Sequence, residues 1–274
     1  MGDEKFMRKK FLCSLIFVFV FAAGACAETV GTLSSNTAMN VKAGLLAALF
    51  DRDFKSENIS IKPYDTAVLM QMALVKGEID AFTAPEFVGE HMLKTNPEYK
   101  LRGFFISRNP IALAFGFLEE KTELRDKFSK VIEDMEEEGK IGILARDFIS
   151  GPKADNPEPV KFEKFDDAET ITVAVTGDMP PLDYVAADGQ PAGFNTAMLA
   201  EIGRRLHVNI KIVNVETGSR AMALKSGRAD AVFWFQIFTG YENFKDQPDI
   251  PEGVIVTTPY YGWNKVMFIG RQSK

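Results

Sequence analysis

The apolar residues of the chain recur with two different periods, and this pattern predicts strands and helices in alternation. In the first half it predicts a strand, a helix and a strand, over Val30–Ser34, Thr37–Phe54 and Ile59–Lys62. The second half repeats that order, over Ile171–Val175, Thr196–Leu206 and Asn209–Val215. Strands that alternate with helices form a mainly parallel sheet, and such a sheet binds ligands where its strands end. We therefore predict an α/β protein with two similar lobes facing each other across a cleft.

The two halves also match directly when the chain is laid on itself at an offset of 150 residues. Met72–Phe82 then lies over Met222–Val232, and both stretches predict a helix, a glycine and a strand. Gly77 and Gly227 are placed to end their helices in the left-handed conformation, and an aspartate follows each glycine three residues later. Any βαβ unit repeats such chemistry, which is the alternative to a true internal repeat. The matching order of the neighbouring elements favours the repeat.

A segment rich in proline, glycine and charge separates the two halves. Ser150–Thr170 has little periodicity and is predicted to be a linker. Before it, Leu124–Ile149 has helical spacing, with the acidic run Glu133–Glu138 as a solvated face. The predicted organisation is a signal peptide over 1–27, one lobe with closing helices over 28–150, the linker over 151–170 and the other lobe over 171–274.

The first 27 residues have the parts of a signal peptide. Basic residues precede an apolar run of about thirteen residues, Phe11–Ala23, and Ala25-Cys26-Ala27 supplies a cleavage site before Glu28. Spanning a bilayer takes about twenty apolar residues, so this run is too short for a membrane anchor. We expect a start at Met1 or Met7 and a periplasmic or otherwise extracytoplasmic protein. A lipid anchor on Cys26 is the disfavoured alternative, because no leucine stands three places before it.

Composition excludes several classes of protein and of site. Both cysteines, Cys13 and Cys26, lie in the leader, so the cleaved chain has no disulfide and burial alone must stabilise its fold. Removing four basic and two acidic leader residues from 32 and 38 leaves 28 and 36, a net charge of about −8. Nucleic acid is therefore not an expected partner. His91 and His207 have no companions at metal-ligand spacing, so we expect no metal and no cofactor.

Several motifs are shared with one family of receptors. In Ile171–Phe233 they are Gly177-Asp178-Met179-Pro180-Pro181-Leu182-Asp183-Tyr184, Asp188-Gly189-Gln190-Pro191-Ala192-Gly193-Phe194-Asn195 and Ala223-Leu224-Lys225-Ser226-Gly227-Arg228-Ala229-Asp230-Ala231. With Thr257–Tyr261, this stretch resembles the first lobe of the periplasmic amino-acid-binding proteins, solute-binding family 3. Val30–Phe148, with Tyr64-Asp65, Lys76–Ala81 and Leu124–Asp126, is similar to the second lobe and closing helices. The resemblance implies a two-lobed periplasmic-binding-protein fold of type II.

The order of the two lobe segments is the reverse of the family's order. A circular permutation explains this reversal, with Ser150–Thr170 joining the old ends, because domain termini commonly lie close together at the surface. We expect such a protein to be a monomer. The alternative is a fragment of a tandem receptor, in which each half finds its complement in another chain and forms a swapped dimer.

The family's clamp for an α-amino acid is mostly missing here. Phe235-Gln236-Ile237 stands where the family has Gly-x-Thr, and no arginine stands near Tyr241 and Glu242. Pro85 occupies the place of the ammonium-binding acid, with Glu86 beside it, and Leu182 replaces an aromatic residue. Amino-acid specificity therefore does not follow from the resemblance.

A candidate binding site remains at the predicted strand ends. Its residues are Arg220, Tyr184, Asp178, Leu182, Trp234, Phe235, Gln236, Ser35, Asn36, Thr37 and Glu86. Arg220 is placed to bind a carboxylate or phosphate in a bidentate contact, and a solvated arginine is the alternative. Ser35, Asn36 and Thr37 offer donors or cap a helix. The aromatic residues offer stacking surface or core packing, and the acids bind a cationic ligand or face solvent.

We expect an extracytoplasmic protein that captures a small polar or amino-acid-like solute between its lobes and presents it to a membrane permease or sensor. Two alternatives stay open. One is a degenerate receptor whose cleft contacts only a membrane sensor. The other is a cleft enzyme of the lyase type, whose acid would be Glu86 or Asp178 with a raised pKa.

Overall fold

In the computed structural model, the described residues are 28–33, 59–155, 159–238, 247 and 249–272. The predicted signal peptide, with Cys26, lies outside them. So do the predicted helix Thr37–Phe54 and the candidate residues Ser35, Asn36 and Thr37. None of the helices in the described ranges is long and apolar enough to cross a bilayer.

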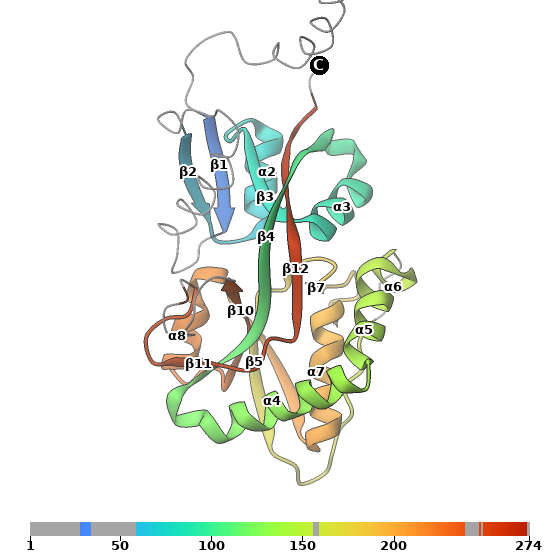
Figure 1. The fold of residues 1–274 in the computed structure, drawn as a ribbon, viewed down its shortest axis with the longest axis vertical. Helices are drawn as coiled ribbons and strands as arrows, with labels where there is room; N and C mark the ends of the chain where they lie inside the picture. The colour runs from blue at the N-terminus through green and yellow to red at the C-terminus, as the bar shows by residue number, and fades with distance from the viewer. Residues whose placement is uncertain (1–27, 34–58, 156–158, 239–246, 248, 273–274) are drawn as a thin grey trace, which may run out of the picture.

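A mixed nine-stranded sheet runs through the molecule (Figure 1). Its order is β2-β1-β3-β12-β4-β10-β5-β9, and β11 pairs with β4. The strands are β1 (Glu28–Leu33), β2 (Ile59–Tyr64), β3 (Ala81–Pro85), β4 (Leu101–Leu118), β5 (Thr170–Val175), β9 (Asn209–Asn214), β10 (Ala231–Phe238), β11 (Val254–Val256) and β12 (Tyr261–Arg271). A small antiparallel sheet of β6 (Asp178–Met179), β7 (Asp183–Val185) and β8 (Pro191–Ala192) lies beside it.

The helices divide between two lobes, as Figure 1 shows. The N-lobe holds β1 to β3 with α2 (Ala67–Lys76), α3 (Glu86–Thr95) and the 3₁₀ turn η2 (Pro97–Tyr99). The C-lobe holds β5 to β11 with α4 (Thr122–Glu137), α5 (Lys140–Ala145), α6 (Pro152–Asp155), α7 (Phe194–Leu206), α8 (Arg220–Lys225) and the short turns η3 (Glu119–Lys121), η4 (Arg146–Ser150) and η5 (Thr217–Ser219). The long strands β4 and β12 run through both lobes and join them.

The described strands follow the same order in both lobes, as the predicted internal repeat requires. In the N-lobe β1 pairs in parallel with β2 and β3, and β12 runs antiparallel beside β3. In the C-lobe β5 pairs in parallel with β9 and β10, and β4 runs antiparallel beside β10. Both lobes are thus mainly parallel sheets flanked by helices, as predicted.

The repeated aspartates make the same contacts in both lobes. Asp80 accepts a hydrogen bond from the Thr29 N–H at 2.9 Å, and its own N–H donates to the Thr29 carbonyl at 2.8 Å. Asp230 does the same with Thr172, at 2.9 and 2.8 Å. Each aspartate therefore ties the start of one strand to its parallel neighbour, which is a structural role.

Over residues 111–117, the crossing strand β4 packs into the core on both faces. Leu113, Phe115 and Phe117 point into the larger core, whereas Ala114 packs into the smaller one. Alternating apolar residues on both faces are what a central strand requires. The sequence pattern did not single out this strand or β12.

Two predicted segments differ from the structure in detail. The helix predicted over Leu124–Ile149 is broken at Gly139, whose φ of 68° lies in the left-handed region that glycine adopts without a Cβ penalty. Within the predicted linker, α6 forms a short helix, and residues 159–169 have neither helix nor strand.

Candidate functional site

The two lobes touch each other where their parallel strands end. The Thr217 N–H, shortly after β9, donates to the Asp65 carbonyl, directly after β2, at 3.3 Å. The Ala67 N–H, at the first residue of α2, donates to Asp178 Oδ2 of β6 at 2.6 Å. The carboxyl ends of the parallel strands in the two lobes therefore face one another, which is where a sheet of this kind places a ligand.

Asp178 is the side chain that reaches across this contact. Its Oδ2 lies at the N-terminus of α2, where a carboxylate is stabilised by exposed N–H groups and the helix dipole. Its Oδ1 is buried without a partner among the described residues. Burial raises the pKa of this carboxyl. The structure thus puts one predicted site residue at the junction of the lobes, with unused acceptor capacity.

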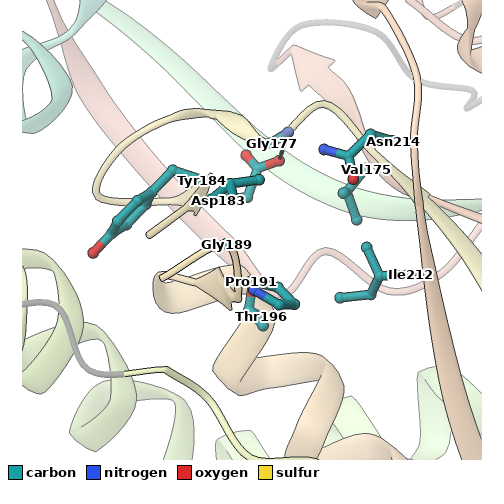
Figure 2. Close-up of a pocket in the computed structure, with 10 residues that line it drawn as sticks. Val175, Gly177, Asp183, Tyr184, Gly189, Pro191, Thr196, Ile212 and Asn214 are labelled. Carbon is teal, nitrogen blue, oxygen red and sulfur yellow. Dashed lines mark hydrogen bonds between the residues drawn. The ribbon is translucent and has the colours of Figure 1, made fainter. Parts of the chain in front are cut away.

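A cavity of about 200 Å³ opens beside this junction, at the ends of β5 and β9 (Figure 2). Its walls are Val175, Gly177, Asp183, Tyr184, Val185, Gly189, Pro191, Thr196, Ile212 and Asn214. Figure 2 shows Asp183, Gly177 and Asn214 together at one end, and the Tyr184 hydroxyl turned away from the group. Tyr184 is the predicted site residue that lines this cavity.

Asp183 is the buried charged group of the cavity wall, with 1% of its surface exposed. Its Oδ2 accepts hydrogen bonds from the Gly177 N–H at 2.8 Å and from Thr176 Oγ1 at 3.1 Å. Its Oδ1 has no partner among the described residues. Burial, and to a lesser degree the charge of Asp178, raise the pKa of the Asp183 carboxyl to about 7.

Arg220, the predicted anion-binding residue, lies in the interior of the C-lobe with 3% of its surface exposed. Its guanidinium forms a bidentate ion pair with Asp249, at 2.8 and 3.1 Å. The remaining donors reach the carbonyls of Thr217 at 2.9 Å and Trp234 at 2.6 Å. Because these donors are engaged, binding of a ligand anion by Arg220 stays a prediction that would require Asp249 to move.

The other predicted residues do not gather at one point. Leu182, Trp234 and Phe235 are buried, and the Gln236 N–H donates to Asp249 at 2.9 Å. Glu86 begins α3 and pairs with Lys265 of β12 at 3.0 Å. Their positions do not test whether these five residues bind a ligand. Their burial and partners match the structural alternatives considered for the aromatic residues.

Other buried polar atoms without a partner lie on elements that meet between the lobes. Within the described ranges they include Tyr64 Oη at the end of β2, Gln71 Nε2 of α2 and Thr217 Oγ1 of η5. A buried polar group without a hydrogen bond costs about 1–3 kcal/mol. A solute or ordered water that supplied partners here would recover part of that free energy.

Sequence reasoning missed three residues of this region. Asp183 follows the buried Leu182 in an otherwise apolar turn, and a charge in such a run was the available signal. Asn214 is an exposed residue at the end of β9, and Asp249 belongs to none of the motifs found in the sequence. Nothing in the sequence pattern distinguishes these two from surface positions.

The described residues contain no group of three acidic or histidine side chains that could hold a metal. His207 instead ends α7 with a left-handed φ of 54°, and its ring lies 4.1 Å from that of Phe165. This environment is a structural one.

One family model matches a large part of the C-lobe. Residues 171–239, which contain β5 to β10, match the family model of bacterial extracellular solute-binding proteins, family 3. We call residues 171–239 the family-3 segment. The three family motifs, the junction residue Asp178 and the cavity residues from Val175 to Asn214 all lie within this family-3 segment.

One individual protein is similar to part of the chain. The chain is 29% identical over 107 residues to "Putative ABC transporter arginine-binding protein 2" of Escherichia coli (strain K12). The matched residues make up 39% of this chain. The match spans 40% of the length of that relative.

Two solved structures overlap with most of the chain. The ligand-binding component of an ABC-type import system from Staphylococcus aureus has a TM-score of 0.47 at 8% identity, covering 90% of this chain and 66% of that one. A structure titled "Putative L-Cystine ABC transporter from Listeria monocytogenes" scores 0.42 at 14% identity, covering 91% and 84%. At such scores the two-lobed architecture rests on this chain's own strand order.

Proposed function

We propose that this protein is an extracytoplasmic receptor that captures a small polar or amino-acid-like solute between its lobes and presents it to a membrane transporter. The observation that carries this proposal is the junction itself. Loops at the carboxyl ends of both parallel sheets meet there, with buried polar atoms that have no partner among the described residues. The family-3 segment and its relative from an ABC transporter support the same class of function.

The connection between the lobes suits a receptor that opens and closes. Two antiparallel strands, β4 and β12, join the lobes, and their pairing has register shifts between Trp263 and Lys265 and between Phe268 and Ile269. Irregular pairing allows a strand pair to bend without breaking the sheet. A solute that contacts both lobes stabilises the closed form by its differential affinity, and a permease or sensor can then recognise that form.

Thermal unfolding of the purified chain against a panel of amino acids, organic acids, amines and aromatic solutes tests this function. A solute at about 100 times its Kd should stabilise the folded state by about 2.7 kcal/mol. Asp178→Asn should reduce the shift, whereas Asp188→Asn, the same change at an exposed turn, should leave it intact. No shift from any solute of a broad panel would contradict the proposal.

The ion pair of Arg220 with Asp249 favours one alternative, the degenerate receptor that contacts only a membrane sensor. Asp249 and the Trp234 carbonyl occupy the guanidinium donors of Arg220, which the sequence predicted to bind a ligand anion. That alternative predicts stabilisation by a membrane partner and by no solute.

One observation favours a cleft enzyme. The carboxyls of Asp178 and Asp183 are neighbours, and both have raised pKa values. Glu86, the other predicted acid, is paired with Lys265 instead. Turnover of a bound solute that Asp178→Asn abolishes while binding persists would favour the enzyme.

A further inference from the structure

Resting on the proposed receptor function, we infer that the cavity at the ends of β5 and β9 binds the ammonium or guanidinium group of an organic cation that needs no carboxylate of its own. The ligand class is a primary amine or a guanidine on a short methylene chain. Asp183 supplies the charged acceptor. Four features of the described residues support this assignment.

The first feature is a carboxylate oxygen in the cavity wall that accepts no hydrogen bond from the described residues. Asp183 is almost fully buried, and only one of its two carboxylate oxygens has donors. Asp178 nearby also has a buried oxygen without a partner. A buried carboxylate is stable in its charged form only when it is paired and hydrogen-bonded. An N–H group of a bound cation would provide the missing pairing.

The second feature is the sign of the charges around the cavity. Within the described ranges, neither Asp183 nor Asp178 forms an ion pair. Two N–H groups at the N-terminus of α7, which borders the cavity at Thr196, are already engaged. The Phe194 N–H donates to the Pro181 carbonyl at 3.0 Å, and the Asn195 N–H to the Leu182 carbonyl at 2.8 Å. The two carboxyl groups without a cationic partner therefore favour a cation at this site.

The third feature is the state of Arg220. A guanidinium is the side chain best suited to bind a ligand carboxylate in a bidentate contact. The guanidinium of Arg220 already holds Asp249, which makes the same bidentate contact that a ligand carboxylate would make. The protein thus carries its own carboxylate in that place, and the Arg220 guanidinium is not free to bind the carboxylate of an amino acid.

The fourth feature is the shape and lining of the cavity. Val175, Ile212 and Pro191 give apolar walls that suit methylene groups, and Tyr184 adds an aromatic ring to the rim. The volume of about 200 Å³ equals the share of roughly seven water molecules in the liquid. A head group with a few methylenes fits that space.

Titration calorimetry of the purified chain at pH 8 tests the assignment, with putrescine and agmatine as probes. Succinate and 1,4-butanediol control for charge and size. The two cations should bind and the controls should not. Asp183→Asn should weaken binding at least tenfold. Asp188→Asn, in the exposed turn of the same hairpin, should bind as the natural chain does.

A pH series on the natural chain provides a test that does not depend on a variant's folding. Cation affinity should fall about tenfold per pH unit below about 7, because a proton then competes for Asp183. The titratable groups near Asp183 are Asp178 of β6, Tyr260 before β12 and the adjacent Tyr184 of β7, whose hydroxyl points away from it. Burial raises the pKa of both tyrosines, so they stay neutral throughout.

The possible outcomes separate this inference from the receptor function. Binding of amino acids or organic acids without binding of putrescine or agmatine would overturn the cation site and leave the receptor standing. Binding of the cations with no pH dependence between pH 5.5 and 8, or equal affinity in Asp183→Asn, would also overturn it. Failure of every solute in the panel would remove the receptor function itself.

Discussion

Arg220 and Asp249 are a buried ion pair whose partners depend on each other. Their side chains are 4% and 2% exposed, and the Arg220 guanidinium also lies 4.1 Å from the Trp234 ring. Removing one member of such a pair leaves the other charge buried and uncompensated. The pair therefore contributes more through the penalty of breaking it than through its own attraction.

We expect Asp249→Ala to lower the free energy of unfolding by about 3–5 kcal/mol, because the Arg220 charge would stay buried without a counter-charge. Urea unfolding at neutral pH measures this change. Glu252→Ala, an exposed acid three residues later, is the matched control and should shift stability by less than about 0.5 kcal/mol. A loss below about 1 kcal/mol in Asp249→Ala would mean that Arg220 finds another partner.

The Asp183 carboxyl should make stability depend on pH in the opposite sense to a salt-bridged acid. Its pKa is raised from 3.8 to about 7, so the folded state binds the proton more tightly than the unfolded state. Its contribution is fully favourable below about pH 4 and is lost as pH rises to about 7. The raised pKa of Asp178 acts in the same direction.

The expected decrease in unfolding free energy between pH 4 and pH 7.5 from Asp183 is at most about 4 kcal/mol. Asp183→Asn should remove most of that pH dependence, and Asp188→Asn should retain it. Chemical unfolding of the three proteins across this pH range measures the difference. The same pH dependence in all three would show that Asp183 does not titrate as described.

At the scale of elements, β4 depends on small residues where it crosses the C-lobe. A Cβ added at Gly116 would overlap the ring of Phe235, whose Cε2 and Cδ2 atoms are its nearest neighbours. A Cβ at Gly103, in the same strand, would meet the Met267 thioether instead, with Sδ at 2.5 Å. A buried ring in a packed core cannot move aside, whereas a methionine side chain adapts easily.

Gly116→Ala should therefore destabilise the protein by about 1–3 kcal/mol, and Gly103→Ala should cost clearly less. The pair is matched, because both changes add one methyl group to β4. Thermal or urea unfolding ranks them. A reversed order would mean that the core around Phe235 is looser than the structure describes.

At the scale of the molecule, the first and last strands begin and end beside one another. The Thr29 N–H at the start of β1 donates to Asp80 Oδ2, and Arg271 at the end of β12 lies 3.6 Å from Asp80 Oδ1. Ends this close can be joined without stretching the fold. The permuted order of the lobe segments remains a hypothesis, and this proximity makes it testable.

A variant that joins residue 274 to residue 28 through a short Gly/Ser linker and opens the chain between 155 and 159 restores the family's order of segments. We expect it to fold as a monomer, with an unfolding free energy within about 2 kcal/mol of the natural chain. Opening the chain between Ala114 and Phe115, inside buried β4, should prevent folding. Failure of the first variant, or a dimer from the natural chain, would favour the swapped-dimer alternative.

The sequence by itself determined the local elements and their repetition. Periodicity located four of the strands and α7, and Gly77 and Gly227 have the left-handed φ values of 81° and 69° predicted for them. These features follow from local chemistry, namely side-chain alternation and the freedom of glycine. The α/β class followed from the same local patterns, and the motifs within residues 171–239 carried the resemblance to solute-binding family 3.

Tertiary structure alone decided which side chains act together. Whether Arg220 faces a ligand or Asp249 depends on a contact 29 residues away, and whether Asp183 is exposed depends on how the β6-β7-β8 sheet packs. The long strands β4 and β12 also became visible only through their pairing across both lobes. Burial and long-range pairing set charge and partner, and neither has a period that a sequence displays.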